Sequence, residues 1–159
     1  RFLAGGFVDP SQIVGMVNMD MIGRASESSV YVVGTQSGVG LADLIRAQGE
    51  DIDLRLRFDN EEFFDRSDQV GFYYSGIPIV FFNTDEHDDY HTPRDTPDLI
   101  MYDDMTKVCA VATGTILELA NRAERVQFVD AYDRLQPVYG QPAQLMIPFP
   151  IEWADRLDY

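Results

Sequence analysis

Both histidines of the chain lie in one short acidic segment. His87 and His91 are four positions apart in DEHDDYHTPRDTPDLI, residues 85–100. On a helix this spacing would place two imidazoles on one face, as in zinc proteases of the HExxH type. Pro93 and Pro97 follow directly, however, and no apolar repeat of helical period runs through the segment. We therefore expect a loop.

A loop can still direct an imidazole at a metal ion. The acidic neighbours would fix the tautomer of the ring and make its free nitrogen more basic. The same residues could equally form a solvated acidic turn in which the two histidines are incidental. The local sequence supports both interpretations.

A second unusual feature is an aspartate inside an apolar run. Asp20 interrupts IVGMVNMDMI, residues 13–22, which otherwise has the pattern of a strand buried on both faces. A lone buried carboxylate costs several kcal/mol unless it is paired or binds a metal. In α/β folds, ligand-binding residues follow the ends of strands. Asp20 is therefore either a ligand or a cap of the turn that precedes Gly23.

The remaining sequence alternates strand patterns with helix patterns. We predict strands over residues 13–22, 29–34, 54–58 and 77–82, and helices over residues 38–48, 67–75 and 103–122. Ser67 is the expected N-cap of the short helix, which should end at Gly76. This alternation predicts an α/β fold, a three-layer sandwich with a mixed, mostly parallel sheet.

The composition is that of a folded, acidic domain. The chain has 159 residues, of which 45% are hydrophobic, and its formal charge is -15. That charge argues against nucleic acid or an anionic membrane surface as a partner, because both need a cationic face. The single cysteine, Cys109, excludes an internal disulfide and a cysteine-based zinc cluster. No apolar run reaches the length of a membrane span, so we expect no membrane insertion.

The composition changes after Glu124. Residues 125–159 contain four of the eight prolines and several aromatic residues, so we divide the chain into residues 1–124 and a Pro/aromatic-rich C-terminal extension. The extension could cover a neighbouring surface or form the contact of a homo-oligomer. Because the chain starts with Arg1 instead of methionine, we expect it to be a processed protein or a piece of a longer one.

Three segments, taken together and in order, resemble a known family. They are NMDMIGR (18–24), RSDQVGFYYSGIPIVFF (66–82) and DEHDDYHTPRDTPD (85–98). The chain is similar to the C-terminal half of the zinc-dependent aminopeptidases with two co-catalytic metals. Relatives of that family include glutamate carboxypeptidases, glutaminyl cyclases and transferrin-receptor-like domains. The resemblance implies a zinc peptidase-like catalytic domain, of which residues 1–124 are the C-terminal part.

The resemblance also assigns roles to residues. It implies that Asp20 ligates one zinc ion and that His91 ligates the other. Asp95 falls where the loop of the family supports the histidine, so we assign it that supporting role. Tyr90 and His87 match the loop pattern as well, and we expect both to line the pocket.

One position departs from the family pattern. Family members usually have Ser-Asp-His where this chain has Ser67, Asp68 and Gln69. A role of that histidine is therefore not transferred to this chain. We expect Asp68 to begin the helix or to anchor a hydrogen bond near the pocket, and not to bind metal.

The other parts of a complete family site are expected upstream. In the family, the first histidine ligand, the bridging aspartate and a Glu-Glu pair with the general base all precede the Asn-x-Asp-Met strand. Residues 1–19 contain no histidine and no glutamate. Glu61 and Glu62 lie downstream, and we interpret them as a solvated charge cluster.

These observations predict the C-terminal segment of a zinc-dependent aminopeptidase, which hydrolyses the N-terminal bond of a peptide substrate. Because catalytic zinc sites use three protein ligands, we expect the isolated chain to be a poor or inactive peptidase. The alternative is a metal-free peptidase-like domain that serves binding or interaction. The resemblance is consistent with a secreted or periplasmic parent protein.

Overall fold

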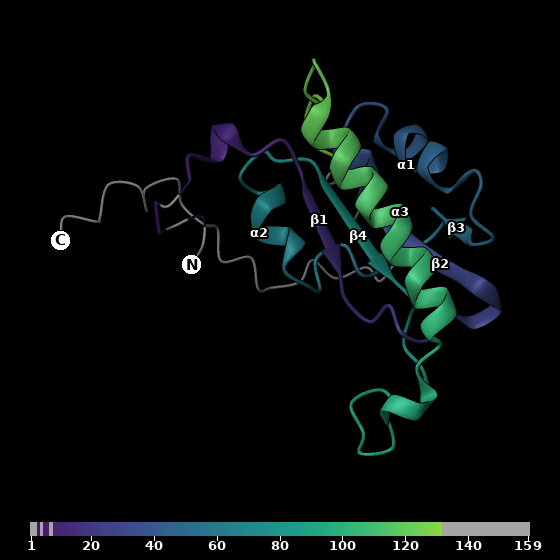
Figure 1. The fold of residues 1–159 in the computed structure, drawn as a ribbon. Coiled ribbons are helices and arrows are strands. Elements are labelled where there is room, and N and C mark those ends of the chain that lie inside the picture. Colours follow the sequence, from purple (N-terminus) through teal and green to yellow (C-terminus); the bar gives the residue numbers. More distant parts are fainter. Residues whose placement is uncertain (1–2, 4, 7, 132–159) are drawn as a thin grey trace.

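The computed structural model describes residues 3, 5–6 and 8–131, which contain four strands and three α-helices (Figure 1). The strands are β1 (Met16–Met19), β2 (Ser29–Val33), β3 (Arg55–Arg57) and β4 (Ile79–Asn83). The α-helices are α1 (Leu41–Gly49), α2 (Gln69–Tyr73) and α3 (Tyr102–Asn121). Short 3-10 helices cover Pro10–Gln12, Ser26–Ser28, Thr35–Ser37 and Pro97–Leu99.

The strands form one mixed sheet in the order β1-β4-β2-β3. β1 runs parallel to β4, with Met16 opposite Ile79 and Met19 opposite Phe82. β2 runs parallel to β3 and antiparallel to β4. Two of the three pairings are thus parallel, and the predicted mixed, mostly parallel sheet is confirmed.

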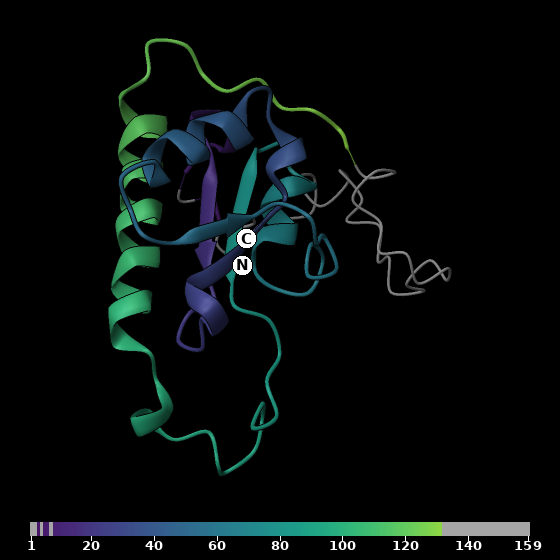
Figure 2. The same ribbon diagram turned by 90° about the vertical axis from the view of Figure 1, so that its right-hand side faces the viewer.

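Helices lie on both faces of the sheet, and each face has its own apolar cluster (Figure 2). On the face of α1 and α3, the strands contribute Val30, Val32, Val80 and Phe82. On the face of α2 they contribute Val33, Ile79 and Phe81. Alternate residues of one strand therefore enter opposite clusters, as the pleat of a strand requires. Full burial of one such side chain contributes about 1.5–3 kcal/mol, and the three layers match the prediction.

β1 is shorter than the apolar run that predicted it. The run covers residues 13–22, but the strand ends at Met19, and Met21 turns the chain with a φ of +59°. Asp20 stands between them, where its N–H still donates to the carbonyl oxygen of Phe82 at 3.3 Å. Asp20 is consequently exposed, so the burial cost expected of a carboxylate inside a strand does not arise.

α2 begins later than predicted. Its N-cap residue is Asp68, whose side chain makes no capping hydrogen bond. The prediction of Ser67 as N-cap was wrong, because its hydroxyl donates to Oδ2 of Asp20 over 3.1 Å instead. The helix also ends earlier than predicted, at Tyr73, although Gly76 has the expected left-handed conformation, with a φ of +75°, and donates its N–H to the carbonyl of Tyr73.

Residues 126–131 pack on the core described above. Val126 joins the cluster under α1 and α3, and Ala131 joins the cluster under α2. The N–H of Val129 donates to the carbonyl of Ser37 at 2.8 Å. The rest of the predicted extension, including its proposed oligomer contact, lies outside the described residues. None of the described helices combines the length and the apolarity of a membrane span.

Candidate metal-binding cavity

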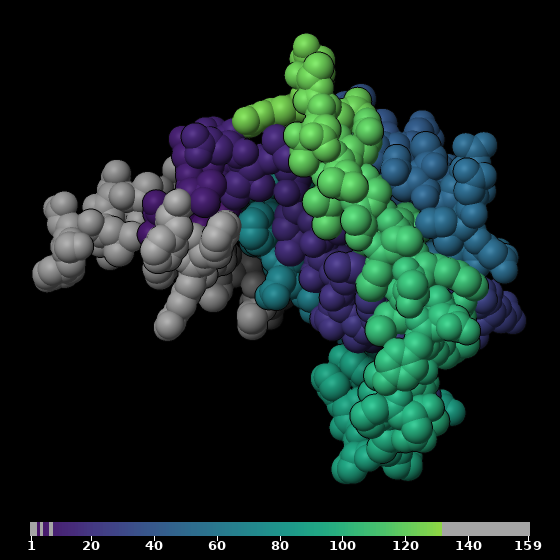
Figure 3. Space-filling view, viewed as in Figure 1, coloured from purple at the N-terminus to yellow at the C-terminus, as the bar shows by residue number. Residues whose placement is uncertain are grey.

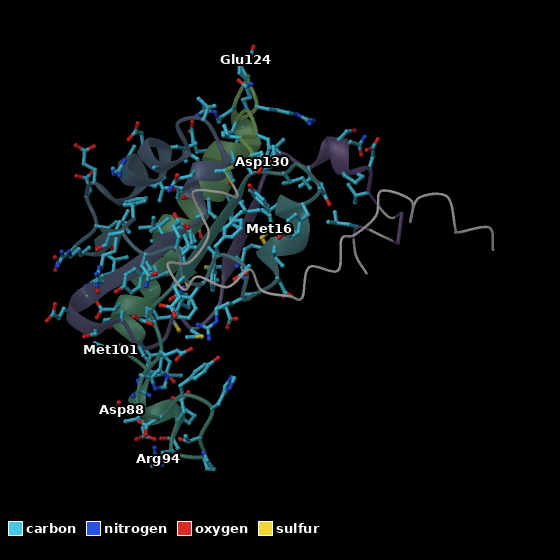
Figure 4. All side chains as sticks on the ribbon, turned by 180° about the vertical axis from the view of Figure 1, so that it is seen from behind. Met16, Asp88, Arg94, Met101, Glu124 and Asp130 are labelled. Carbon is cyan, nitrogen blue, oxygen red and sulfur yellow. The ribbon has the colours of Figure 1, made fainter. Side chains whose placement is uncertain are left out.

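The segments that follow β1 and β4 form the candidate site. Because these strands are parallel neighbours, their carboxyl ends meet at the same edge of the sheet, which is where α/β folds place ligands. Residues 84–100 follow β4 as a loop that projects from the body of the molecule before α3 begins (Figures 1 and 3). Asp88 and Arg94 lie towards the far end of this projecting loop, well away from Met16 in β1 (Figure 4).

A cavity of about 480 Å³ lies between the segment after β1 and the projecting loop. Five of the predicted site residues line it, namely Asp20, His87, Tyr90, His91 and Asp95. The other lining residues are Met21, Gly23, Arg24, Thr92, Thr96, Pro97 and Ile100. The sixth predicted residue, Asp68, is exposed at the N-cap of α2 and lies outside this lining.

The carboxylate of Asp20 is held by a chain of hydrogen bonds. The amide nitrogen of Asn18 donates to Oγ of Ser67 at 3.1 Å, and this hydroxyl donates to Oδ2 of Asp20 at 3.1 Å. Through Ser67, both Asn18 and the carboxylate of Asp20 are connected to the segment that leads into α2. Asn18 was not predicted as a site residue, although a polar residue in an apolar strand was the available signal.

Gln69 occupies the position at which the family pattern has histidine. Its side chain is fully buried. Nε2 of Gln69 donates to the carbonyl oxygens of Phe63 at 3.0 Å and Phe64 at 2.8 Å. Oε1 accepts from Nδ2 of Asn18 at 2.9 Å. Gln69 therefore joins β1, α2 and the 63–64 segment, and it supports Asn18, which in turn donates to Ser67, the residue that holds Asp20.

Arg24 connects the segment after β1 to the projecting loop. Nη1 of Arg24 donates to Oδ1 of Asp95 at 2.8 Å, and Nη2 donates to Oδ2 of Asp89 at 3.4 Å. Asp89 also accepts from Nε of Arg94 at 2.9 Å. The hydrogen bonds from Arg94 and then Arg24 hold the pKa of Asp89 below its usual value. Arg24 was not predicted as a site residue.

The two histidines are held differently. His91 is exposed, has a φ of +55°, and stacks on the ring of Tyr90 with the ring centroids 3.8 Å apart. His87 is half-buried, with Nε2 at 3.7 Å from Oδ2 of Asp95 and a buried Nδ1 that has no hydrogen-bond partner. Asp95 thus contacts Arg24 and His87, and its support of His91 stays a prediction.

The donor types in the cavity suit zinc, but their number does not complete a site. Carboxylate oxygen and imidazole nitrogen are ordinary zinc ligands, and catalytic zinc sites use three protein ligands. Within the part of the chain that the structure describes, no group of three or more His, Cys, Asp or Glu could hold a metal ion. The metal roles of Asp20 and His91 therefore stay predictions.

Glu61 differs from the solvated charge cluster that we predicted for it. The residue is half-buried, and its Oε2 accepts a hydrogen bond of 2.7 Å from the N–H of Gly34. Burial raises the pKa of Glu61 to about 7. Glu61 lies outside the lining of the cavity, so its carboxyl group is not part of the candidate site.

Comparisons with solved structures agree with this fold. The LapA aminopeptidase of Legionella pneumophila matches with a TM-score of 0.55 and 21% identity, over 68% of this chain and 31% of that one. An aminopeptidase from Aneurinibacillus sp. strain AM-1 matches with a TM-score of 0.56 and 22% identity, over 86% of this chain and 32% of that one. At such identities the likeness concerns the fold, and the chain spans about a third of the length of either enzyme.

The sequence comparison is more specific about the family. No curated protein sequence matches the chain significantly. The family model of peptidase family M28 matches residues 6–116, which is more than half of the chain and includes all three segments that suggested the resemblance. The chain belongs to peptidase family M28.

Proposed function

We propose that this chain is a segment of a zinc-dependent aminopeptidase, in which Asp20 and His91 are ligands of two neighbouring zinc ions. The observation that carries the proposal is that these two residues, from different and distant segments, line one cavity. The family is a peptidase family, and both solved structures described above are named aminopeptidases. The substrate would be a peptide with a free N-terminus.

The surroundings of the two residues support this role. Ser67 donates to one oxygen of the Asp20 carboxylate and so limits its rotation. Tyr90 stacks on the imidazole of His91 with an interplanar angle of 19°. Oriented ligands of this kind bind a metal more tightly than free ones. In this proposal the remaining ligands and the general base come from residues outside the chain.

The proposal is tested by titrating the chain with zinc while the imidazole resonances of His91 are followed by NMR. Zinc is expected to shift these resonances. Asp20→Ala should weaken the response at least tenfold, because it removes the carboxylate on the other side of the cavity. Asp68→Ala is the matched control, since Asp68 lies outside the cavity, and it should behave as wild type. A response that is equally strong in Asp20→Ala would contradict a shared site.

Activity gives a second test. With added zinc, the chain alone should hydrolyse leucyl-p-nitroanilide poorly or not at all, because its described residues provide fewer than three placed ligands. Robust zinc-dependent turnover by the isolated chain would show that it holds a complete site. In a longer protein that supplies the other ligands, Asp20→Ala and His91→Ala should each lower kcat/KM by more than about 100-fold, beyond the effect of losing an outer partner.

A metal-free binding or interaction domain is the second candidate function. The observation that favours it is the lack of a three-ligand group among the described residues. In that case zinc would leave the resonances of His91 unchanged at concentrations that saturate ordinary protein sites. The titration described above therefore separates the two functions.

A further inference from the structure

The backbone hydrogen bonds of the projecting loop explain little of how its middle part is held against the body. Between Thr84 and Met101 its backbone hydrogen bonds run mainly within the loop, as from Tyr90 to His87 and from Asp95 to Thr92. Backbone bonds to the body occur at its two ends, where Thr84 donates to Met21 and Met101 donates to Gly23. The part that carries His91 lies between these ends, and the ribbon shows it extending away from the sheet (Figures 1 and 2).

A single guanidinium group reaches both sides of His91. Arg24 pairs with Asp89, which precedes His91, and with Asp95, which follows it. The two contacts use different nitrogen atoms, Nη2 and Nη1, which is the bridging geometry that a planar guanidinium allows. The side chain of Arg24 is only 22% exposed, so these pairs are screened less than free surface pairs.

Arg24 is itself anchored to the body. Its backbone N–H donates to Oγ1 of Thr84 at 3.3 Å, and the carbonyl of the preceding Gly23 accepts from Met101 at 2.9 Å. Among the described residues, the ion pairs that reach the loop from outside it are those of Arg24 and, at the start of the loop, one between Arg66 and Glu86. Arg24 is therefore the outside cation that acts on the region around His91.

We propose that Arg24 is a positioning residue that holds the projecting loop against the segment after β1, so that His91 and Asp20 face one cavity. Asp89 and Asp95 are its two partners. The positioning itself does not depend on zinc, whereas its consequence for metal binding rests on the proposed function. Lysine should replace Arg24 poorly, because all its donors lie on one nitrogen, whereas Arg24 reaches Asp95 and Asp89 with two nitrogens of a planar group.

The experiment measures the distance between the loop and the body without any metal. Spin labels are attached at Asp88→Cys on the loop and Glu50→Cys after α1, both exposed positions, in a Cys109→Ser background. Pulsed dipolar spectroscopy should give one narrow distance distribution for the chain with Arg24. Arg24→Met should at least double its width, and Arg24→Lys should also broaden it. Arg46→Met is the matched control, because Arg46 pairs with Asp43 within α1, and it should leave the distribution unchanged.

A variant that fails to fold would also broaden the distance distribution. A second variant therefore removes the same bridge from the loop side. Asp89→Asn combined with Asp95→Asn should broaden the distribution as Arg24→Met does, with the circular dichroism of the chain unchanged. Adding Arg24→Met to this pair should broaden it no further, because one bridge is lost in every case. A distribution as narrow as wild type in Arg24→Met or Arg24→Lys would overturn the proposal.

The zinc titration keeps this inference separate from the proposed function. If His91 responds to zinc, Arg24→Met should weaken that response by about 10–100-fold, as the loss of a group that orients a ligand does. A broadened loop in Arg24→Met without any zinc response in wild type would uphold the positioning role and reject the zinc site. A zinc response in wild type, together with an unchanged distance distribution in Arg24→Met, would uphold the zinc site and reject the positioning role.

Discussion

The hydroxyl of Ser67 donates a hydrogen bond of 3.1 Å to Oδ2 of Asp20. Ser67 stands just before α2 and Asp20 just after β1, so the bond joins the helix to the edge of the sheet at which the cavity opens. Asn18 donates to the same hydroxyl, and Gln69 accepts from Asn18. The predicted metal ligand is thereby held by residues that themselves lie outside the cavity lining.

Ser67→Ala should weaken the zinc response of His91 about 10–100-fold, because the carboxylate of Asp20 loses the group that orients it. NMR titration with zinc measures the change. Ser75→Ala is the control, since the hydroxyl of Ser75 donates to the carbonyl of Gly71 within the α2 region and is exposed. An unchanged response in Ser67→Ala would show that the hydrogen bond does not position Asp20 for metal.

Gln69→Leu should lower the free energy of unfolding by roughly 2–4 kcal/mol. Leucine leaves the carbonyl of Phe64 without the hydrogen bond from Gln69, which costs about 1–3 kcal/mol. The carbonyl of Phe63 and the amide of Asn18 also lose a bond to Gln69, but they keep their bonds with Arg66 and Ser67 and add less. Urea denaturation, monitored by circular dichroism, measures the change. The exposed Gln36 is the control, and Gln36→Leu should stay within about 0.5 kcal/mol of wild type.

The carboxyl group of Glu61 should make stability depend on pH. Its pKa is raised by burial from 4.5 to about 7 in the folded chain, so between these values the folded chain keeps a proton that the unfolded chain releases. The free energy of unfolding therefore falls as pH rises from about 4.5 to about 7, and the loss is complete above that range.

Glu61→Gln tests this dependence. Glutamine cannot ionise but can still accept the hydrogen bond from the N–H of Gly34. The free energy of unfolding of the variant should equal that of wild type at pH 4 and exceed it at pH 8 by about 1–3 kcal/mol. Denaturation curves recorded across this range measure the difference. If the free energy of unfolding changed with pH in the same way in wild type and in Glu61→Gln, the raised pKa would be contradicted.

Gly34→Ala should destabilise the fold more than Gly76→Ala. Both glycines have a positive φ, of +80° and +75° respectively, so both substitutions carry the strain of a left-handed residue, about 1–2 kcal/mol. A Cβ on Gly34 would also lie 1.9 Å from Cδ1 of Ile79, whereas one on Gly76 meets nothing within 4 Å. This overpacking should add about 1–3 kcal/mol, which thermal or urea unfolding detects.

Ile79→Val provides the check on that mechanism, because valine lacks the Cδ1 atom that a Cβ on Gly34 would meet. The double variant Gly34→Ala, Ile79→Val should therefore be less destabilised than the sum of its two single variants. Strictly additive losses would show that the clash with Ile79 is not the cause.

Much of the architecture was predictable from local pattern. The helical spacing of apolar residues identified α1 and α3, and the β-branched and apolar runs identified the four strands. Pro93 and Pro97 excluded a helix around the two histidines. Short elements were less well predicted, because the ends of β1 and α2 depend on neighbours that the local sequence does not contain.

The candidate residues of the cavity came from the order of three motifs, not from geometry. Asp20 and His91 were selected by resemblance, and the structure places both in one lining. Asp68 was selected on the same basis and lies outside it. Arg24, Asn18 and Gln69 were missed as supporting residues, because nothing in their local sequence indicates which distant groups they contact.

The sequence by itself determined the elements, their alternation and the membership in a peptidase family, since these depend on residue periodicity, prolines and motif order. Only the tertiary structure decided that the hydroxyl of Ser67 donates to Asp20 instead of capping α2. It also decided that Glu61 is half-buried beside the N–H of Gly34, and that Arg24 donates to both Asp89 and Asp95. Each of these contacts joins residues far apart in the chain, and their partners are set by how the layers pack and not by any local pattern.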